Sequence, residues 1–241
     1  MLDLDAGRIA EALAMARQVQ KQRPKEAVGY VLEGDVHALK KSWKDAATVY
    51  RNGIKQSGAT ELAVKLHAVL VADGATGEAA SFSESWLKDH AKDGQFRLYL
   101  AESANARKDY ATAGKHYRLL VDAQPNNPAM LNNLAWSLSQ TKDPKAIEYA
   151  EKAYKLAPEQ PAIIDTLGWL LVEKGDTSRG LDLLQKANSL APQNAMIRLN
   201  LAKALLKVEK KTEAKKELDE LTQLGDKFPA QAEVQKLLQG L

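Results

Sequence analysis

The chain has 241 residues, of which 45% are hydrophobic and 27% charged, and it contains no cysteine. Its 34 basic and 31 acidic residues leave a net charge of +3, too small for a surface dedicated to nucleic-acid phosphates. The lack of cysteine excludes disulfide scaffolds, thiolate zinc sites and cysteine nucleophiles. No apolar stretch approaches the roughly 18 residues of a membrane span. Composition therefore predicts an ordered globular chain that does not cross a membrane.

Small residues recur every 33 or 34 residues along the chain, before aliphatic ones. The first series consists of Ala12, Ala46, Ala80, Ala113, Ala146, Gly180 and Ala214. The second lies twelve residues upstream and consists of Gly34, Ala68, Ala101, Ala135, Gly168 and Ala202. A third marks the ends of the units with Pro24, Pro125, Pro158 and Pro192, and with Gly58 and Lys92 in the slots between. Three series in register indicate a repeat architecture.

The unit at 161–194 shows what one repeat contains. Apolar or small residues at i, i+3, i+4 and i+7 predict one face of a first helix, at Ile164, Leu167, Gly168 and Leu171. Gly175 supplies the turn that ends this helix, and a second helix runs on to Pro192. We expect Gly168 and Gly180 to meet where the two helices cross, because glycine allows a close backbone approach. No alternation of period two predicts a strand.

This pattern resembles the tetratricopeptide repeat. The resemblance implies an all-α fold, a tetratricopeptide-repeat α-solenoid in which helix hairpins form a right-handed superhelix with a concave groove. In chain order it predicts a single solenoid over 1–241, divided into a half repeat at 1–26, repeats at 27–60, 61–93, 94–127, 128–160, 161–194 and 195–225, and a C-terminal capping helix at 228–240. Repeat 61–93 is the poorest match, with Glu84 where a large apolar residue is usual. Because the chain opens on a second helix, we expect it to be a piece of a longer solenoid.

Lysines crowd the last repeat, at Lys207, Lys210, Lys211, Lys215 and Lys216. A terminal repeat needs a polar outer face for solubility, which favours a capping role for these residues. Binding of an anion is the alternative.

A more specific resemblance lies in the run LNNLAWSLSQTKDPKAIEYAEKAYKLAPEQPAIIDTLGWLLVEKGD and in the tail FPAQAEVQKLL. Both are similar to the C-terminal part of the tetratricopeptide lipoproteins of the PEP-CTERM/exosortase system. This implies a bacterial envelope protein on the periplasmic face, lipid-anchored through a distant N-terminus and associated with exopolysaccharide production and PEP-CTERM protein sorting. A cytoplasmic location stays open, because the sequence does not contain the lipobox that carries the anchor.

Catalytic chemistry has no support in the sequence. The four histidines stand at unrelated positions of different repeats, and no HExxH, GxSxG, Walker or GxGxxG motif is present. The carboxylates Glu217, Asp219 and Glu220 are interleaved with lysines, which is typical of a solvated helix face. We therefore expect no enzyme activity, no metal and no cofactor.

The resemblance places ligand contacts on the first helices, whose second, fifth, ninth, twelfth and thirteenth positions point into the groove. Carried over position by position, it predicts a partner-binding groove formed by Glu102, Asn105, Asn132, Trp136, Gln140, Asp165, Trp169, Glu173, Lys203 and Lys207. In repeat 61–93 the fifth and ninth positions are Lys65 and Val69. The carboxylate clamp of chaperone-tail binders needs Lys and Asn at these two positions, so that function is not supported.

Trp136 and Trp169 stand at the ninth position of adjacent repeats. Neighbouring packed helices lie about 8–10 Å apart, so we expect two adjacent aromatic rungs. With Asn132 and Asp165 beside them, the indoles offer the flat contact area and hydrogen bonding of a recognition hot spot. Packing of each indole against the preceding repeat is an equal alternative.

The sequence thus favours a non-catalytic scaffold that binds a protein or peptide partner in its groove. Carbohydrate binding is one alternative, because indole faces flanked by amides and carboxylates also hold sugar rings, and it makes a polysaccharide the other expected ligand. A regulatory module of a larger enzyme is another alternative. Nucleic acid is not among the expected partners.

Overall fold

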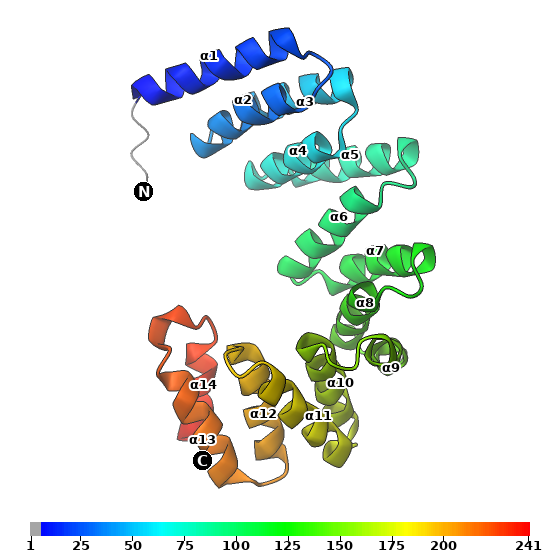
Figure 1. Ribbon diagram of the computed structural model, residues 1–241, viewed down its shortest axis with the longest axis vertical. Helices are drawn as coiled ribbons and strands as arrows, with labels where there is room; N and C mark the ends of the chain where they lie inside the picture. Colours follow the sequence, from blue (N-terminus) through cyan, green and yellow to red (C-terminus); the bar gives the residue numbers. More distant parts are fainter. Residues whose placement is uncertain (1–5) are drawn as a thin grey trace. The chain divides into compact units, whose positions relative to one another are not determined.

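The computed structural model describes residues 6–241, and all regular structure in that range is helical (Figure 1). It consists of fourteen α-helices and one short 3-10 helix, so the predicted all-α class is confirmed. Residues 1–5 of the predicted half repeat 1–26 lie outside the described residues.

The helices alternate as first and second members of hairpins. The first helices are α2 (Val28–Leu39), α4 (Thr60–Ala72), α6 (Gly94–Ala106), α8 (Pro128–Gln140), α10 (Pro161–Lys174) and α12 (Ala195–Lys207). The second helices are α3 (Trp43–Ser57), α5 (Thr76–Asp89), α7 (Tyr110–Ala123), α9 (Ala146–Leu156), α11 (Thr177–Leu190) and α13 (Lys211–Thr222). They are preceded by α1 (Ala6–Gln22) and followed by η1 (Gly225–Lys227) and α14 (Gln231–Gln239).

The chain divides into two compact units. Unit 1 is Met1–Leu100 and unit 2 is Ala101–Leu241, so the boundary falls inside α6. The organisation of all repeats as one solenoid stays a prediction.

Glycine allows the two helices of the hairpin α10–α11 to approach closely. A Cβ atom added to Gly180 would lie 2.7 Å from the carbonyl oxygen of Gly168 and 2.6 Å from Cγ2 of Val172. A Cβ atom added to Gly168 would lie 3.0 Å from the carbonyl oxygen of Gly180. The predicted meeting of the two glycines is therefore confirmed, and any larger side chain would push the helices apart.

The register predicted for repeat 61–93 is wrong by one residue. Ala68 and Ala80 are exposed, whereas His67 and Ala79 are buried in their place. Intervals of 33 and 34 residues both occur in this chain, so periodicity alone could not choose between the neighbours. The fifth and ninth positions of this repeat are consequently Val64 and Ala68. Val69, predicted at the ninth position, is buried. Lys65, predicted at the fifth position, forms an ion pair with Asp35 on α2, with its Nζ 2.8 Å from Oδ1.

An aromatic cluster accommodates the histidine at this small-residue position. His67 is only 5% exposed, and its Nδ1 lies 2.9 Å from the hydroxyl of Tyr99. The rings of Phe96 and Tyr99 meet the imidazole edge to face, at centroid distances of 6.2 Å and 5.4 Å. At this position of α4, unit 1 therefore packs a histidine against two rings of α6, the first helix of the next repeat.

Asp93 ties three elements of unit 1 together. Its Oδ1 accepts from the amide of Phe96 in the first turn of α6, as an N-cap does. Its Oδ2 accepts from the indole Nε1 of Trp86 at 2.9 Å and from the hydroxyl of Thr60 at 2.8 Å. Partial burial opposes ionisation, but the hydrogen bonds from Phe96, Trp86 and Thr60 outweigh it and lower the pKa of Asp93.

The last helix covers the end of unit 2. Val234 of α14 and Phe228 before it pack against Leu199 of α12 and against Leu218 and Leu221 of α13. The α-helix begins at Gln231, because Pro229 and the extended backbone at Phe228 separate it from η1. The five lysines of the last repeat are exposed, and two of them pair with acids of α13: Lys210, just before the helix, with Glu213, and Lys215 with Asp219.

We expect Asp93→Ala to lower the free energy of unfolding by about 1–2 kcal/mol, because it removes an N-cap and two side-chain hydrogen bonds. The pKa of Asp93 is lowered by folding, so its contribution is complete above the unfolded value of about 3.9 and is lost as the pH falls through the folded value. Urea titrations at pH 7 and pH 3 test this. A difference between wild type and variant that is as large at pH 3 as at pH 7 would contradict the expectation.

Candidate functional site

The ten residues singled out from the sequence all belong to unit 2, and we call them the first-helix strip. They are Glu102 and Asn105 on α6, Asn132, Trp136 and Gln140 on α8, Asp165, Trp169 and Glu173 on α10, and Lys203 and Lys207 on α12. Helix α10 packs against both α8 and α12, and the three helices follow one another in unit 2 (Figure 1).

Asp165 lies at the contact between α10 and α12. Asn200 on α12 donates Nδ2 to both carboxyl oxygens of Asp165, at 2.9 Å from Oδ2 and 3.2 Å from Oδ1. No Lys, Arg or His in the part of the chain that the structure describes forms an ion pair with Asp165. Burial disfavours the charged carboxylate and the single amide donor offsets this only in part, so the pKa of Asp165 rises to about 7.

Trp169, one helical turn after Asp165, is buried, with 9% of its surface exposed. The ammonium nitrogens of Lys203 and Lys207 lie 4.8 Å and 5.6 Å from its ring centroid, within the range of cation–π attraction. Lys203 also pairs with Glu233 of α14, with Nζ 2.9 Å from Oε1. The indole is thus covered by lysines of the following repeat, whereas the alternative expected from the sequence was packing against the preceding one.

Trp136 differs from Trp169, because it is partly exposed on α8. Asn132, one turn earlier on the same helix, carries a buried Oδ1 that accepts no hydrogen bond from any described residue. An unsatisfied buried acceptor costs about 1–3 kcal/mol, so a hydrogen-bond donor arriving at this point would be stabilised. Trp136 and Asn132 together place a partly exposed aromatic ring beside a buried, unsatisfied acceptor.

The members on α6 repeat this combination in part. Glu102 is exposed, and the Oδ1 atom of Asn105 is again buried without a partner among the described residues. Tyr117 of α7 is fully buried; its burial and the nearby Glu102 carboxylate raise the pKa of Tyr117 to about 12, against the opposing hydrogen bond with Asn133.

The remaining members lie toward the C-terminal ends of their helices. Gln140, Glu173 and Lys207 are all exposed. They extend the strip without adding a buried group, which leaves Asn132, Asp165 and Trp136 as its partly covered centre.

Sequence reasoning missed Asn200, the partner of Asp165. The positions taken from the family pattern include Leu199 at the fifth place of α12, and that leucine is buried with 1% exposed. Asn200 stands one position later, 35 residues after Asp165. An amide beside apolar residues on a first helix was the signal that could have identified it.

A separate cavity of about 1190 Å³ lies in unit 2, at the turn before α12 and at the segment between η1 and α14. Its walls are mostly apolar and include Pro192, Met196, Phe228 and Pro229. It contains no member of the first-helix strip.

Within residues 6–241, no group of three or more acidic or histidine side chains is placed to hold a metal ion. The described helices also include none with the length and hydropathy to cross a membrane.

Family models described as tetratricopeptide repeat match residues 171–241 and residues 1–59 and 77–128. These ranges include most of the chain, which therefore belongs to the tetratricopeptide repeat proteins. Members of this family mediate protein–protein interactions and are generally non-catalytic scaffolds.

Curated relatives are similar over part of their length. The chain is 30% identical over 110 residues to TPR repeat-containing protein PA4667 of Pseudomonas aeruginosa, which is 45% of this chain and 19% of that protein. It is 30% identical over 149 residues to anaphase-promoting complex subunit 7 of Arabidopsis thaliana, which is 59% of this chain and 26% of that protein. The chain thus spans no more than 26% of either relative.

Solved structures are similar in fold. The structure of pilF from Pseudomonas aeruginosa matches with a TM-score of 0.62 and 17% identity, over 95% of this chain and 99% of that chain. A chain of the anaphase-promoting complex tetramer Cut9-Hcn1 matches with a TM-score of 0.62 and 16% identity, over 97% of this chain and 46% of that chain. At such low identity the likeness concerns the fold alone.

Asp165→Asn is expected to change how stability depends on pH. Because folding raises the pKa of Asp165 from about 3.9 to about 7, the folded state binds more protons between these values and loses stability as the pH rises through them. The variant cannot ionise, so at pH 8 it should be more stable than wild type by roughly 1–2 kcal/mol, less than a fully buried group would give.

Urea titrations at pH 4.5 and pH 8, followed by tryptophan fluorescence, measure this effect. Asp122→Asn on α7 is the matched control, because it makes the same chemical change at an exposed site and should follow the wild-type profile. A constant difference between wild type and Asp165→Asn at both pH values would contradict the expectation.

Proposed function

We propose that unit 2 binds an extended segment of a partner protein along the first-helix strip. The observation that carries the proposal is the centre of the strip, where the partly exposed Trp136 lies beside the unsatisfied Oδ1 of Asn132. An aromatic side chain with neighbouring hydrogen-bonding groups is the usual composition of an interaction hot spot. Backbone amides of an extended segment are donors that would satisfy Asn132 and Asn105.

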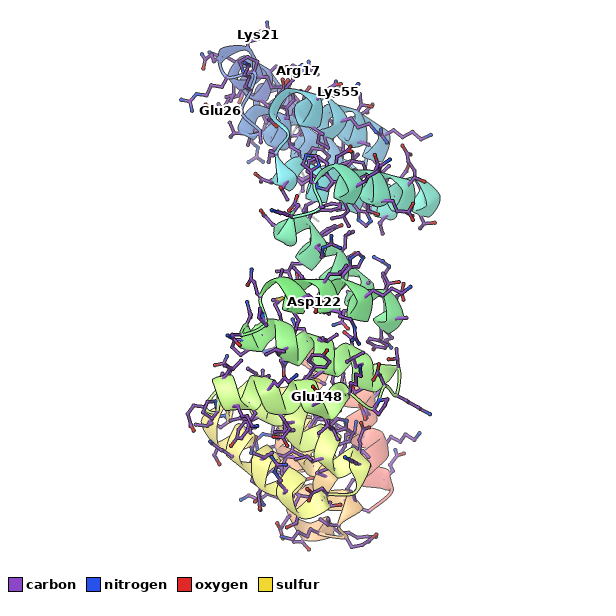
Figure 2. The ribbon with its side chains drawn as sticks, turned by 90° about the vertical axis from the view of Figure 1, so that its right-hand side faces the viewer. Arg17, Lys21, Glu26, Lys55, Asp122 and Glu148 are labelled. Carbon is purple, nitrogen blue, oxygen red and sulfur yellow. The ribbon has the colours of Figure 1, made fainter. Side chains whose placement is uncertain are left out.

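The outer side of unit 2 provides a contrast. Figure 2 shows Asp122 on α7 and Glu148 on α9 on the same side of the unit, and both side chains are exposed. Glu148 pairs with Lys152 on its own helix. This side presents solvated charges, so it offers a surface for control variants.

Carbohydrate binding through a pair of indoles has less support. Trp169 is buried and Lys203 and Lys207 lie over its ring, so a sugar could stack on Trp136 but would not meet two free indole faces. Binding of an oligosaccharide is therefore the competing outcome in the test of Trp136→Ala.

We further propose that the protein acts in the bacterial envelope, in a system for exopolysaccharide production and PEP-CTERM protein sorting. The support is the similarity of the NNLAW and DTLGW runs and of the FPAQAEVQKLL tail to the lipoproteins of that system. Fractionation of the native protein from its source cells tests this. Recovery from the membrane fraction only after detergent supports the proposal, whereas recovery with soluble cytoplasmic markers contradicts it.

Trp136→Ala tests the binding site. A phage-displayed library of random 12-residue peptides is selected on immobilised wild-type protein, and the binding of enriched peptides to variants is measured by interferometry. We expect Trp136→Ala to lower their affinity at least about tenfold, as loss of a hot-spot aromatic does. The double variant Asp122→Asn/Glu148→Gln should bind as wild type does.

Circular dichroism must show that Trp136→Ala keeps its helices. Peptides that bind the Trp136 variant as tightly as wild type would place the contact elsewhere and contradict the proposal. A library that yields no binder, together with Trp136-dependent retention of an oligosaccharide, would favour the carbohydrate alternative.

A further inference from the structure

The charges of the first-helix strip are separated along unit 2. Helix α8 carries no Asp, Glu, Lys, Arg or His at all. The charged members of the strip on α6 and α10 are acids, Glu102, Asp165 and Glu173, whereas both members on α12 are lysines. A ligand that lies over α8 and α10 therefore meets negative charge and open acceptors.

Asp165 is the most unusual of these acids, because it is held at the α10–α12 contact without a cation. The nearest lysine of the strip on α12, Lys203, is occupied by the carboxylate of Glu233 and by the ring of Trp169. Asn200 supplies one nitrogen to the two carboxyl oxygens, which leaves most of their lone pairs unused. A partly buried carboxylate in this situation is stabilised by any cation that reaches it.

Asn132 lies at the same repeat position of α8 as Asp165 does of α10, and these two helices are in contact. Its buried Oδ1 accepts no hydrogen bond from the described residues. Two acceptors with unused capacity thus stand on adjacent helices, with the partly exposed Trp136 one turn further along α8. Ammonium and guanidinium groups carry only donors and also favour the face of an indole.

We propose that the ligand of unit 2 is a peptide segment with a lysine or arginine side chain that enters from the α8 side and donates to Asp165 and Asn132. This deepens the proposed function and rests on it. The lysines on α12 repel a basic residue from the other direction, which fixes the side from which it enters. The ligand's cation supplies the counter-charge that the fold itself does not give to Asp165.

The proposal predicts that binding strengthens as the pH rises. A neutral carboxyl at low pH attracts the cation weakly, and an ionised carboxylate attracts it strongly. On α12, the helix that supplies Asn200, the charged groups Arg198 and Lys203 are engaged: Arg198 pairs with Glu217 and Lys203 with Glu233.

A synthetic array of 12-residue peptides tests the proposal. The peptides form matched pairs that are identical except for one central residue, Lys in one member and Gln in the other. We expect the Lys members to bind wild type about tenfold more tightly than the Gln members at pH 8, and to lose most of that preference at pH 5.5. Asp165→Asn should abolish both the preference and its pH dependence.

Asp122→Asn is the matched control, because it removes the same charge from the outer side of unit 2 and should leave the preference for Lys unchanged. A double-mutant cycle between Asp165→Asn and Lys→Gln in the peptide should show coupling, so that the two changes together cost no more than either alone.

Each other outcome has a definite meaning. Pairs that bind equally well in Lys and Gln form, with Trp136-dependent affinity, overturn this inference and leave the proposed function standing. An equal loss in Asp165→Asn and Asp122→Asn assigns the preference to overall charge and also overturns it. An array in which no peptide binds contradicts the inference and the proposed function together.

Discussion

The close crossing of the two helices in the hairpin α10–α11 is the constraint on which the centre of unit 2 depends. In the hairpin α10–α11 the backbones approach so closely that Gly168 and Gly180 leave no space for a Cβ atom. Such a contact fixes the rotation of each helix about its own axis, because one position must face the partner. Once that position is fixed, Asp165, three residues before Gly168, is directed toward α12, where Asn200 meets it. The polar strip is thus a consequence of where the small residues stand.

Unit 1 carries a larger side chain at the small-residue position of a first helix. His67 takes the small-residue position of α4, and the rings of Phe96 and Tyr99 pack around it. Asp93 then connects α4, α5 and α6 through hydrogen bonds from Thr60, Trp86 and Phe96. These side-chain contacts join the repeat that fits the sequence pattern worst to the first helix of the next repeat.

The elements of the fold were predictable from the sequence because they depend on periodicity and local end signals. The spacing of small and apolar residues indicated the helix pairs, and the meeting of Gly168 and Gly180 followed from steric size alone. The register of repeat 61–93 was not predictable in this way, since Ala68 and Ala80 each stand beside the residue that is actually buried.

For the strip, the sequence indicated the helices and the outward positions. It could not distinguish Trp136 from Trp169, because burial of the second indole depends on two lysines and an acid that come from α12 and α14. Asn200 was missed for the same reason: its role exists only through its contact with the next helix.

A carboxyl group with little compensation and an amide oxygen with no partner both reduce the stability of a fold. Leucine at the position of Asp165 would avoid this cost; at the equivalent position of α12, Leu199 is buried against Leu218 and Leu221 of α13. Helix α14 adds to the imbalance, because Glu233 engages Lys203, a strip lysine of α12. Departures from the most stable arrangement are expected where a protein meets a ligand, since groups left unsatisfied in the free protein can be satisfied in the complex. In unit 2 these departures fall on adjacent helices and concern acceptors alone, so the ligand that compensates them must bring donors and positive charge.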